Sequence, residues 1–166
     1  MSVNLSGKQF NQPLLSDRVN QILQDTGLDA ASLRLEITEG AIMDSAEFAA
    51  EILQQLRDLG VQLSIDDFGT GYSSLGRLYH FPINELKIDR SFVAQMERSS
   101  ENSYIVETIL TLAHNLGLFV TAEGVETASQ LAQLRALECE YGQGNFFSQP
   151  LDSEAAEALI RQNPHW

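Results

Sequence analysis

The stretch "LSIDDFGTGYSSL", from Leu63 to Leu75, decides how the rest of the chain is interpreted. An apolar run typical of a buried strand ends there on two adjacent carboxylates, Asp66 and Asp67, and a glycine-rich loop follows. Two like charges at the end of a buried strand repel each other and lose hydration. The pair therefore requires positive charge nearby.

The composition is that of an ordinary globular domain, with 166 residues of which 43% are hydrophobic and 20% charged. The formal net charge of −13 argues against a binder of nucleic-acid polymers and against an anionic membrane surface. A small anionic ligand stays compatible if metal ions mediate the contact. The sequence has no run of 18 apolar residues and no signal-peptide pattern, so we expect no membrane insertion. The single cysteine, Cys139, excludes an internal disulfide and favours a reducing, cytoplasmic compartment.

Strand-like and helix-like runs alternate along the chain. We expect strands over residues 2–5, 33–38, 62–65, 85–88 and 118–122, and a weak one over 138–141. We expect helices over residues 13–26, 45–59, 101–116, 127–136 and 153–161. Three of these helices stop just before a glycine, which is a common helix C-terminus, and Thr127 is a plausible N-cap. The alternation predicts an α/β fold with a mostly parallel sheet.

Polar residues gather where the predicted strands end. They are Glu36 and Glu39, Asp66 and Asp67, Lys87 and Asp89, Glu123 and Glu126, and Gln143. A (β/α)₈ barrel builds its active site from strand ends in this way, but it needs eight strands and roughly 200 to 400 residues. We therefore predict an incomplete, TIM-like (β/α)₈ barrel with about six of eight strands. An open doubly wound sheet is the alternative.

The acids of this set are hard oxygen donors, which suit Mg²⁺, Mn²⁺ or Ca²⁺ rather than a structural zinc. Adjacent aspartates such as Asp66 and Asp67 can serve two ions, as in sites for displacement at phosphorus. Such ions would supply the positive charge that the pair requires. The alternative is that some of these acids only cap helices or form a ring of solvated charge.

The lysine near the acids and the glycine-rich loop can each be interpreted in two ways. Lys87 could hold a phosphate or a water as a point charge, or it could pair with Asp89 or with the acidic cluster. Gly69, Thr70 and Gly71 could allow a positive φ or the close approach of a ligand, or they could form an ordinary ordered loop.

Six segments together resemble the EAL domain family, the cyclic-di-GMP phosphodiesterases. In chain order they are "VNLSGKQF", "LRLEITEG", "IDDFGTGYSSL", "LKIDRSFV", "AEGVET" and "YGQGNFFSQP". The resemblance covers nearly the whole chain, which we take as a single EAL-like domain over residues 1–166. It implies a (β/α)₈ barrel that hydrolyses one phosphodiester of cyclic-di-GMP to linear pGpG with two Mg²⁺ or Mn²⁺ ions.

The resemblance also implies roles for single residues. Four match the family's metal ligands: Asn4, Glu36, Asp66 and Asp67. Glu123 matches the acid proposed to activate water, with Lys87 and Gln143 matching residues beside that water. Glu39 matches the glutamate that steadies the loop after the paired aspartates. We group with it Gly69, Thr70 and Gly71 of that loop, and Glu126 of the "AEGVET" motif. The loop, residues 68–75, matches the one that ties the metal site to a dimer interface.

The Glu-Ala-Leu signature of the family lies on its first strand, upstream of the segment that matches "VNLSGKQF", and this chain lacks it. We therefore expect an N-terminally truncated barrel, with the intact parent active and this fragment weakly active or inactive. The alternatives are a non-catalytic module that binds cyclic-di-GMP for signalling and a dimerisation element. Open barrel edges invite pairing with another chain, so a homodimer is expected.

Overall fold

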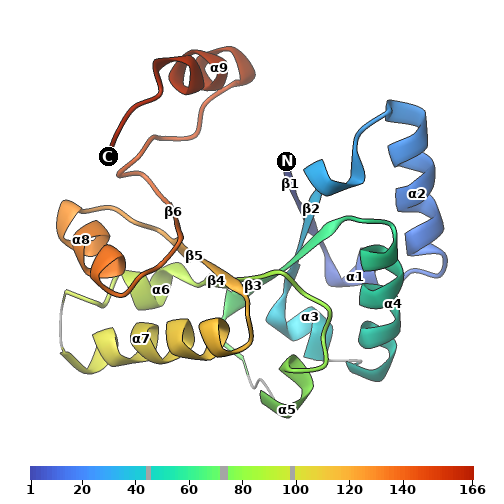
Figure 1. The fold of residues 1–166 in the computed structure, drawn as a ribbon, viewed down its shortest axis with the longest axis horizontal. Coiled ribbons are helices and arrows are strands. Elements are labelled where there is room, and N and C mark those ends of the chain that lie inside the picture. The colour runs from blue at the N-terminus through green and yellow to red at the C-terminus, as the bar shows by residue number, and fades with distance from the viewer. Residues whose placement is uncertain (44–45, 72–74, 98–99) are drawn as a thin grey trace.

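The computed structural model describes residues 1–43, 46–71, 75–97 and 100–166. Within these ranges one sheet of six parallel strands has the order β1-β2-β3-β4-β5-β6. The strands are β1 (Ser2–Leu5), β2 (Arg34–Thr38), β3 (Gln62–Phe68), β4 (Glu85–Ile88), β5 (Phe119–Glu123) and β6 (Tyr141–Gln143). Each strand pairs with the next along the chain, and the sheet forms part of a barrel with helices around its outside (Figure 1). The incomplete (β/α)₈ barrel is confirmed. The unbroken strand order excludes a doubly wound sheet, in which the order reverses.

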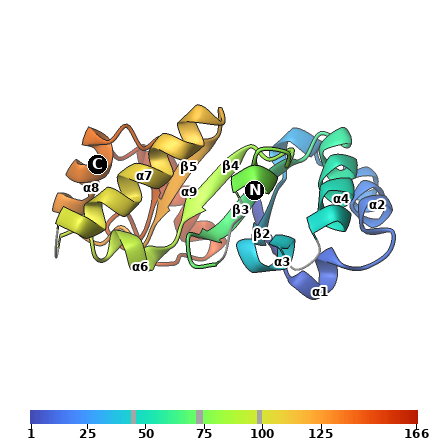
Figure 2. The ribbon, with the colours of Figure 1, turned by 90° about the horizontal axis from the view of Figure 1, so that it is seen from below.

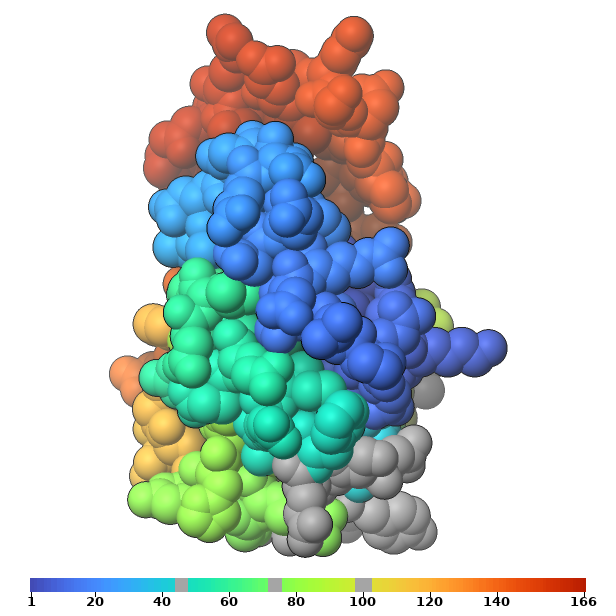
Figure 3. Space-filling model, turned by 90° about the vertical axis from the view of Figure 1, so that its right-hand side faces the viewer, coloured from blue at the N-terminus to red at the C-terminus, as the bar shows by residue number. Residues whose placement is uncertain are grey.

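The helices form two groups on either side of the central strands (Figure 2). The first contains α1 (Gly7–Phe10), α2 (Leu15–Thr26), α3 (Glu39–Met43) and α4 (Ala46–Asp58). The second contains α6 (Arg90–Val93), α7 (Ser100–Asn115) and α8 (Ala128–Ala136), while α5 (Leu75–Leu78) precedes β4 and α9 (Ser153–Gln162) stands apart. Helices α2 and α4 contact each other and cover the N-terminal side of the molecule (Figure 3). In the part of the chain that the structure describes, no helix combines the length and hydrophobicity that a membrane crossing requires.

The five longer predicted helices lie within two residues of their expected bounds, and the capping box of Thr127 and Gln130 confirms the expected start of α8. Residue 45, where the second predicted helix was to begin, lies outside the described residues. The short helices α1, α3, α5 and α6 and a 3₁₀ turn over Ala30–Ser32 were not expected. Each is too short to show a helical period in the sequence.

The weak strand predicted over residues 138–141 is wrong in its position, because β6 covers Tyr141–Gln143 instead. Glu138 has a φ of 60°, and the amides of Glu138 and Cys139 bond back to the carbonyls of Arg135 and Leu134. This is the Schellman pattern of a helix C-terminus. The segment that looked like the start of a strand therefore completes the end of α8.

The strand predicted over residues 62–65 is too short, because β3 runs to Phe68 and contains both Asp66 and Asp67. The register with β4 shifts between Ile65 and Phe68, and Asp67 takes a φ of 54° inside that irregularity. The two aspartates therefore lie in a bulged strand end, where a bulge redirects side chains.

Alternation along the strands separates an apolar face from a polar one. On β4, Leu86 and Ile88 are fully buried among the apolar residues of the core. Glu85 and Lys87 alternate with them and point to the other face, toward the inside of the barrel. Strands of a parallel sheet are usually apolar on both faces, so charged groups on the inner face indicate a functional site.

Candidate active site

The predicted site residues lie at the carboxyl ends of consecutive strands. They are Asn4 on β1, Glu36 on β2, Asp66 and Asp67 on β3, Lys87 on β4, Glu123 on β5 and Gln143 on β6. The parallel register places Asn4 opposite Glu36, and Glu123 opposite Gln143. Asn4 and Gln143 are exposed, and among the described residues neither side chain forms a hydrogen bond. The structure thus brings five of the seven side chains into one cluster and leaves Asn4 and Gln143 on the flanking strands.

Lys87 is the centre of the cluster. Its Nζ lies 2.6 Å from Glu123 Oε1, 2.7 Å from Glu36 Oε2 and 3.3 Å from Asp66 Oδ1. Burial, with only 4% of Lys87 exposed, would by itself lower the pKa of the amine, but the hydrogen bonds with Glu123 and Glu36 raise it above its ordinary value. Lys87 therefore stays charged and pairs with the acidic cluster. Its alternative partner, Asp89, instead caps α6 through the amide of Ser91.

A second grouping contains only carboxylates. One oxygen each from Asp66, Asp67 and Glu123 lies within 4.8 Å of the others. Burial raises the pKa of Glu123, while Lys87 lowers it in part. Burial and the neighbouring charges of Asp66 and Asp89 raise the pKa of Asp67. Three acids held this close favour a divalent cation, which would offset their repulsion.

Glu39 organises the loop that follows the paired aspartates. Its buried carboxylate accepts hydrogen bonds from the amides of Gly69 at 2.8 Å and Gly71 at 3.4 Å. Thr70 Oγ1 donates to the carbonyl of Asp67 at 2.8 Å. A side chain could not be added freely here, because a Cβ at Gly71 would lie 2.9 Å from Glu39 Oε1. The structure thus brings Glu39 and this loop together, although residues 72–74 of the predicted loop lie outside the described residues.

Glu126 is exposed and lies outside the cluster, at the entrance to α8. Its backbone amide donates to Gln130 Oε1 at 2.7 Å, as part of the cap of that helix. A role for the Glu126 side chain in stabilising the loop stays a prediction.

Three further polar residues, not predicted from the sequence, lie one layer below the cluster. Glu85, Arg34 and Thr121 each lie two residues before Lys87, Glu36 and Glu123, and they contact one another. The signal was present as the two-residue period of a strand, which puts residues i and i+2 on one face. It was hidden because these strands are short and mostly apolar.

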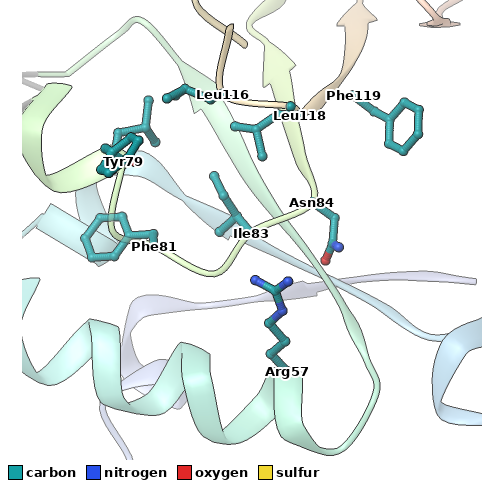
Figure 4. A pocket seen from close by; sticks show the side chains of 10 residues that line it. Arg57, Tyr79, Phe81, Ile83, Asn84, Leu116, Leu118 and Phe119 are labelled. Carbon is teal, nitrogen blue, oxygen red and sulfur yellow. The ribbon is translucent and has the colours of Figure 1, made fainter. Parts of the chain in front are cut away.

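One hollow near the strands lies away from the cluster. A pocket of about 340 Å³ opens between the loops that lead into β4 and β5, lined by Tyr79, Phe81, Ile83 and Leu118 with Arg57 of α4 (Figure 4). It is at the amino ends of the strands, opposite the end that carries Lys87. This pocket therefore takes no part in the site.

Comparison with known proteins defines the class. The family model of the EAL domain matches residues 1–150, and the chain belongs to this family. A Pseudomonas aeruginosa protein named cyclic di-GMP phosphodiesterase NbdA is 45% identical over 161 residues, which are 97% of this chain and 21% of that protein. The chain spans about a fifth of the length of the curated relatives that it matches.

Solved structures of related proteins have the same fold. The PaMucR phosphodiesterase in complex with c-di-GMP superposes with a TM-score of 0.91 at 42% identity, covering 93% of this chain and 63% of that one. The EAL domain of Mycobacterium smegmatis DcpA superposes with a TM-score of 0.92 at 36% identity, covering 99% of this chain and 74% of that one. The family model thus shows the family over residues 1–150, and the solved structures show the fold.

Proposed function

We propose that this chain is the C-terminal portion of a cyclic-di-GMP phosphodiesterase barrel, one EAL-like domain over residues 1–166, and that the intact protein hydrolyses one phosphodiester to give linear pGpG. The observation that carries the proposal is the cluster of Lys87 with Glu36, Asp66 and Glu123 at the ends of four neighbouring strands. Relatives named as cyclic di-GMP phosphodiesterases, and a similar structure with c-di-GMP, support the substrate. We place the reaction in the cytoplasm, and we expect the fragment alone to be weakly active or inactive.

We also propose that two divalent cations, Mg²⁺ or Mn²⁺, are held by Asn4, Glu36, Asp66 and Asp67. The donor set fits them, because these side chains offer hard oxygen atoms. Glu36 and Asp66 are already gathered around the buried Lys87, and Asp67 lies close to Asp66 and Glu123. When bound, the ions would supply positive charge to the phosphate oxygens and acidify the attacking water.

The residues around that position have complementary roles. Glu123 accepts a proton from the attacking water, and its raised pKa makes it a stronger base than an ordinary glutamate. Lys87 remains protonated, so it orients Glu123 and attracts the phosphate as a fixed cation. Gln143, beside Glu123 on the next strand, contributes a carboxamide that can orient the same water. Glu39 holds the loop that follows the paired aspartates.

The test is direct. The purified intact protein is incubated with cyclic-di-GMP and Mn²⁺, then separately with Mg²⁺, and pGpG is sought by chromatography. Asp66→Ala should abolish the product, whereas Asp58→Ala, which removes an exposed carboxylate at the end of α4, should not. If the intact protein binds cyclic-di-GMP without forming pGpG, the enzymatic proposal is wrong and a non-catalytic binding module takes its place.

We further propose that the protein forms a homodimer. The loop held by Glu39 leads toward α5, and the adjoining Tyr79 is 71% exposed, so a second copy of the chain could cover this large aromatic side chain. Light scattering across a range of protein concentrations tests this proposal. A monomer at every concentration, with and without cyclic-di-GMP, would contradict it.

A further inference from the structure

A second polar layer lies on the inner face of the sheet, beneath the cluster around Lys87. We call it the lower layer, and it consists of Arg34, Ser64, Glu85 and Thr121. Arg34 Nη1 lies 2.5 Å from Glu85 Oε2, and Thr121 Oγ1 donates to Glu85 Oε1. Glu85 is only 1% exposed, so these two partners stand in for the water that its carboxylate has lost.

The lower layer repeats the strand connections of the cluster above it. In the cluster, Lys87 on β4 reaches Glu36 on β2 and Glu123 on β5. In the lower layer, Glu85 on β4 reaches Arg34 on β2 and Thr121 on β5. Each member precedes its counterpart by two residues, so the same three strands are tied twice on one face. The signs are reversed, since the upper centre is a cation and the lower centre an anion.

β3 lies between β2 and β4, so Arg34 must cross it to reach Glu85. Ser64 is the lower-layer residue on β3, opposite Glu85 in the register, and it is 1% exposed. Its Oγ lacks a hydrogen-bond partner among the described residues, as do Arg34 Nε and Glu85 Oε2, so the contact of Arg34 with Glu85 is an ion pair rather than an aligned hydrogen bond. A small side chain at position 64 leaves room for the arginine to cross. These unsatisfied atoms cost stability, which is the opposite of what a layer selected only for stability would show.

We propose that the lower layer, centred on Glu85, is a positioning device for the reaction. It fixes β2 and β5 relative to β4, so that Glu36 and Glu123 keep their distances from Lys87 and from the bound ions. The hydrogen bond that Glu85 accepts from Thr121 is directional, unlike apolar packing, and the ion pair with Arg34 ties β4 to β2. Both contacts act two residues from the groups that they position. The inference rests on the proposed function for its kinetic consequence only, because the geometry and the affinity for metal can be measured without turnover.

Thr121→Val tests the proposal most cleanly, because valine has nearly the shape of threonine and lacks only the hydroxyl. Since a displacement of about 1 Å can cost about 10²-fold in rate, we expect kcat of the intact protein for cyclic-di-GMP to fall about tenfold or more with KM little changed. We expect the Kd for Mn²⁺, measured by calorimetry, to rise several-fold. Thr121→Ser, which restores the hydroxyl, should recover both values, and Glu85→Gln should change both in the same direction as Thr121→Val.

Val120→Ala is the matched control. Val120 is the fully buried neighbour on the apolar face of β5, so this variant loses stability without touching the lower layer. If stability alone mattered, Val120→Ala and Thr121→Val would change kcat and the affinity for Mn²⁺ in proportion to their losses in Tm. That outcome, or a Thr121→Val variant equal to wild type in both measurements, would overturn the proposal.

Failure of the proposed function gives a different pattern. An intact wild-type protein that never forms pGpG would refute the phosphodiesterase, yet the Mn²⁺ affinities would still decide the role of the lower layer. A crystal structure of Thr121→Val provides a second test, which does not depend on enzymatic activity. We expect the separation of Lys87 Nζ and Glu123 Oε1 to grow by about 0.5 Å, the tolerance of a preorganised site, and an unchanged separation would count against the proposal.

Discussion

At the scale of single residues, Asp67 shows how a site can cost stability. Burial and the charges of Asp66 and Asp89 raise its pKa above 3.8, so the folded protein holds this proton more tightly than the unfolded chain. The carboxylate therefore destabilises the metal-free fold as the pH rises through that raised pKa. Asparagine tolerates the left-handed φ of 54° and has no charge. We expect Asp67→Asn to raise the free energy of unfolding at pH 7 by up to about 1 kcal/mol.

Urea denaturation without divalent cations measures this effect, and the gain should shrink as the pH is lowered toward 3.8. Asp17→Asn is the control, because it removes an equal charge from the exposed first turn of α2, where an acid is favourable. The stabilised variant should also gain less Tm from added Mn²⁺ than the wild type does. A loss of stability in Asp67→Asn at pH 7 would show that Asp67 does not repel its neighbours.

Lys87 should have the opposite effect. Lys87→Met removes the cation that three carboxylates share and leaves those acids buried against one another. Breaking a buried charge network in this way costs about 3 to 5 kcal/mol, so we expect a loss of that order at pH 7 without divalent cations. Denaturation in the presence of Mn²⁺ should recover part of it. Lys8→Met, which removes an exposed lysine of α1, should change stability by about 0.5 kcal/mol or less, and an equal loss in both variants would contradict the network.

At the scale of elements, the contact between Glu39 and the loop after β3 can be tested with two glycines. Gly71→Ala places a Cβ 2.9 Å from the buried Glu39 carboxylate, so we expect a loss of about 1 to 2 kcal/mol in stability together with reduced turnover. Gly40→Ala is the matched control, because a Cβ there meets nothing within 4 Å and alanine favours the helix α3. Gly40→Ala should be neutral or stabilising. Similar losses in both variants would argue that the loop is insensitive to its contact with Glu39.

The elements also show what the sequence could predict. The longer helices and four of the six strands in the described ranges were placed nearly correctly, since periods and terminal glycines are local signals. The extension of β3 to Phe68 was not predicted, because the left-handed backbone conformation at Asp67 depends on the pairing of β3 with β4. Asp66 and Glu123 were recognised by type and strand position. The lower layer of Glu85 and its partners was not recognised, because the contact that Arg34 makes across β3 depends on the tertiary structure.

At the scale of the whole molecule, the net charge of −13 opposes an anionic substrate at long range, even where Lys87 and bound cations attract it at short range. At 0.1 M salt the Debye length is about 10 Å, so the repulsion between exposed charges farther apart than this is largely screened. The interactions within the buried cluster are screened less. With Mn²⁺ saturating, the association rate constant for cyclic-di-GMP should therefore rise about two- to fivefold between 0.01 and 0.15 M NaCl. This is the reverse of the salt dependence of a protein with a basic groove for phosphates.

Stopped-flow fluorescence measures that rate constant, and guanosine, which has no charge, serves as the control ligand. Its association should not depend on salt, which separates screening from any effect of NaCl on the fold. If the rate constant for cyclic-di-GMP instead falls with salt, the approach is governed by the local field of the site. The acidic exterior would then have no influence on substrate capture, and the charge of the chain would bear on its solubility alone.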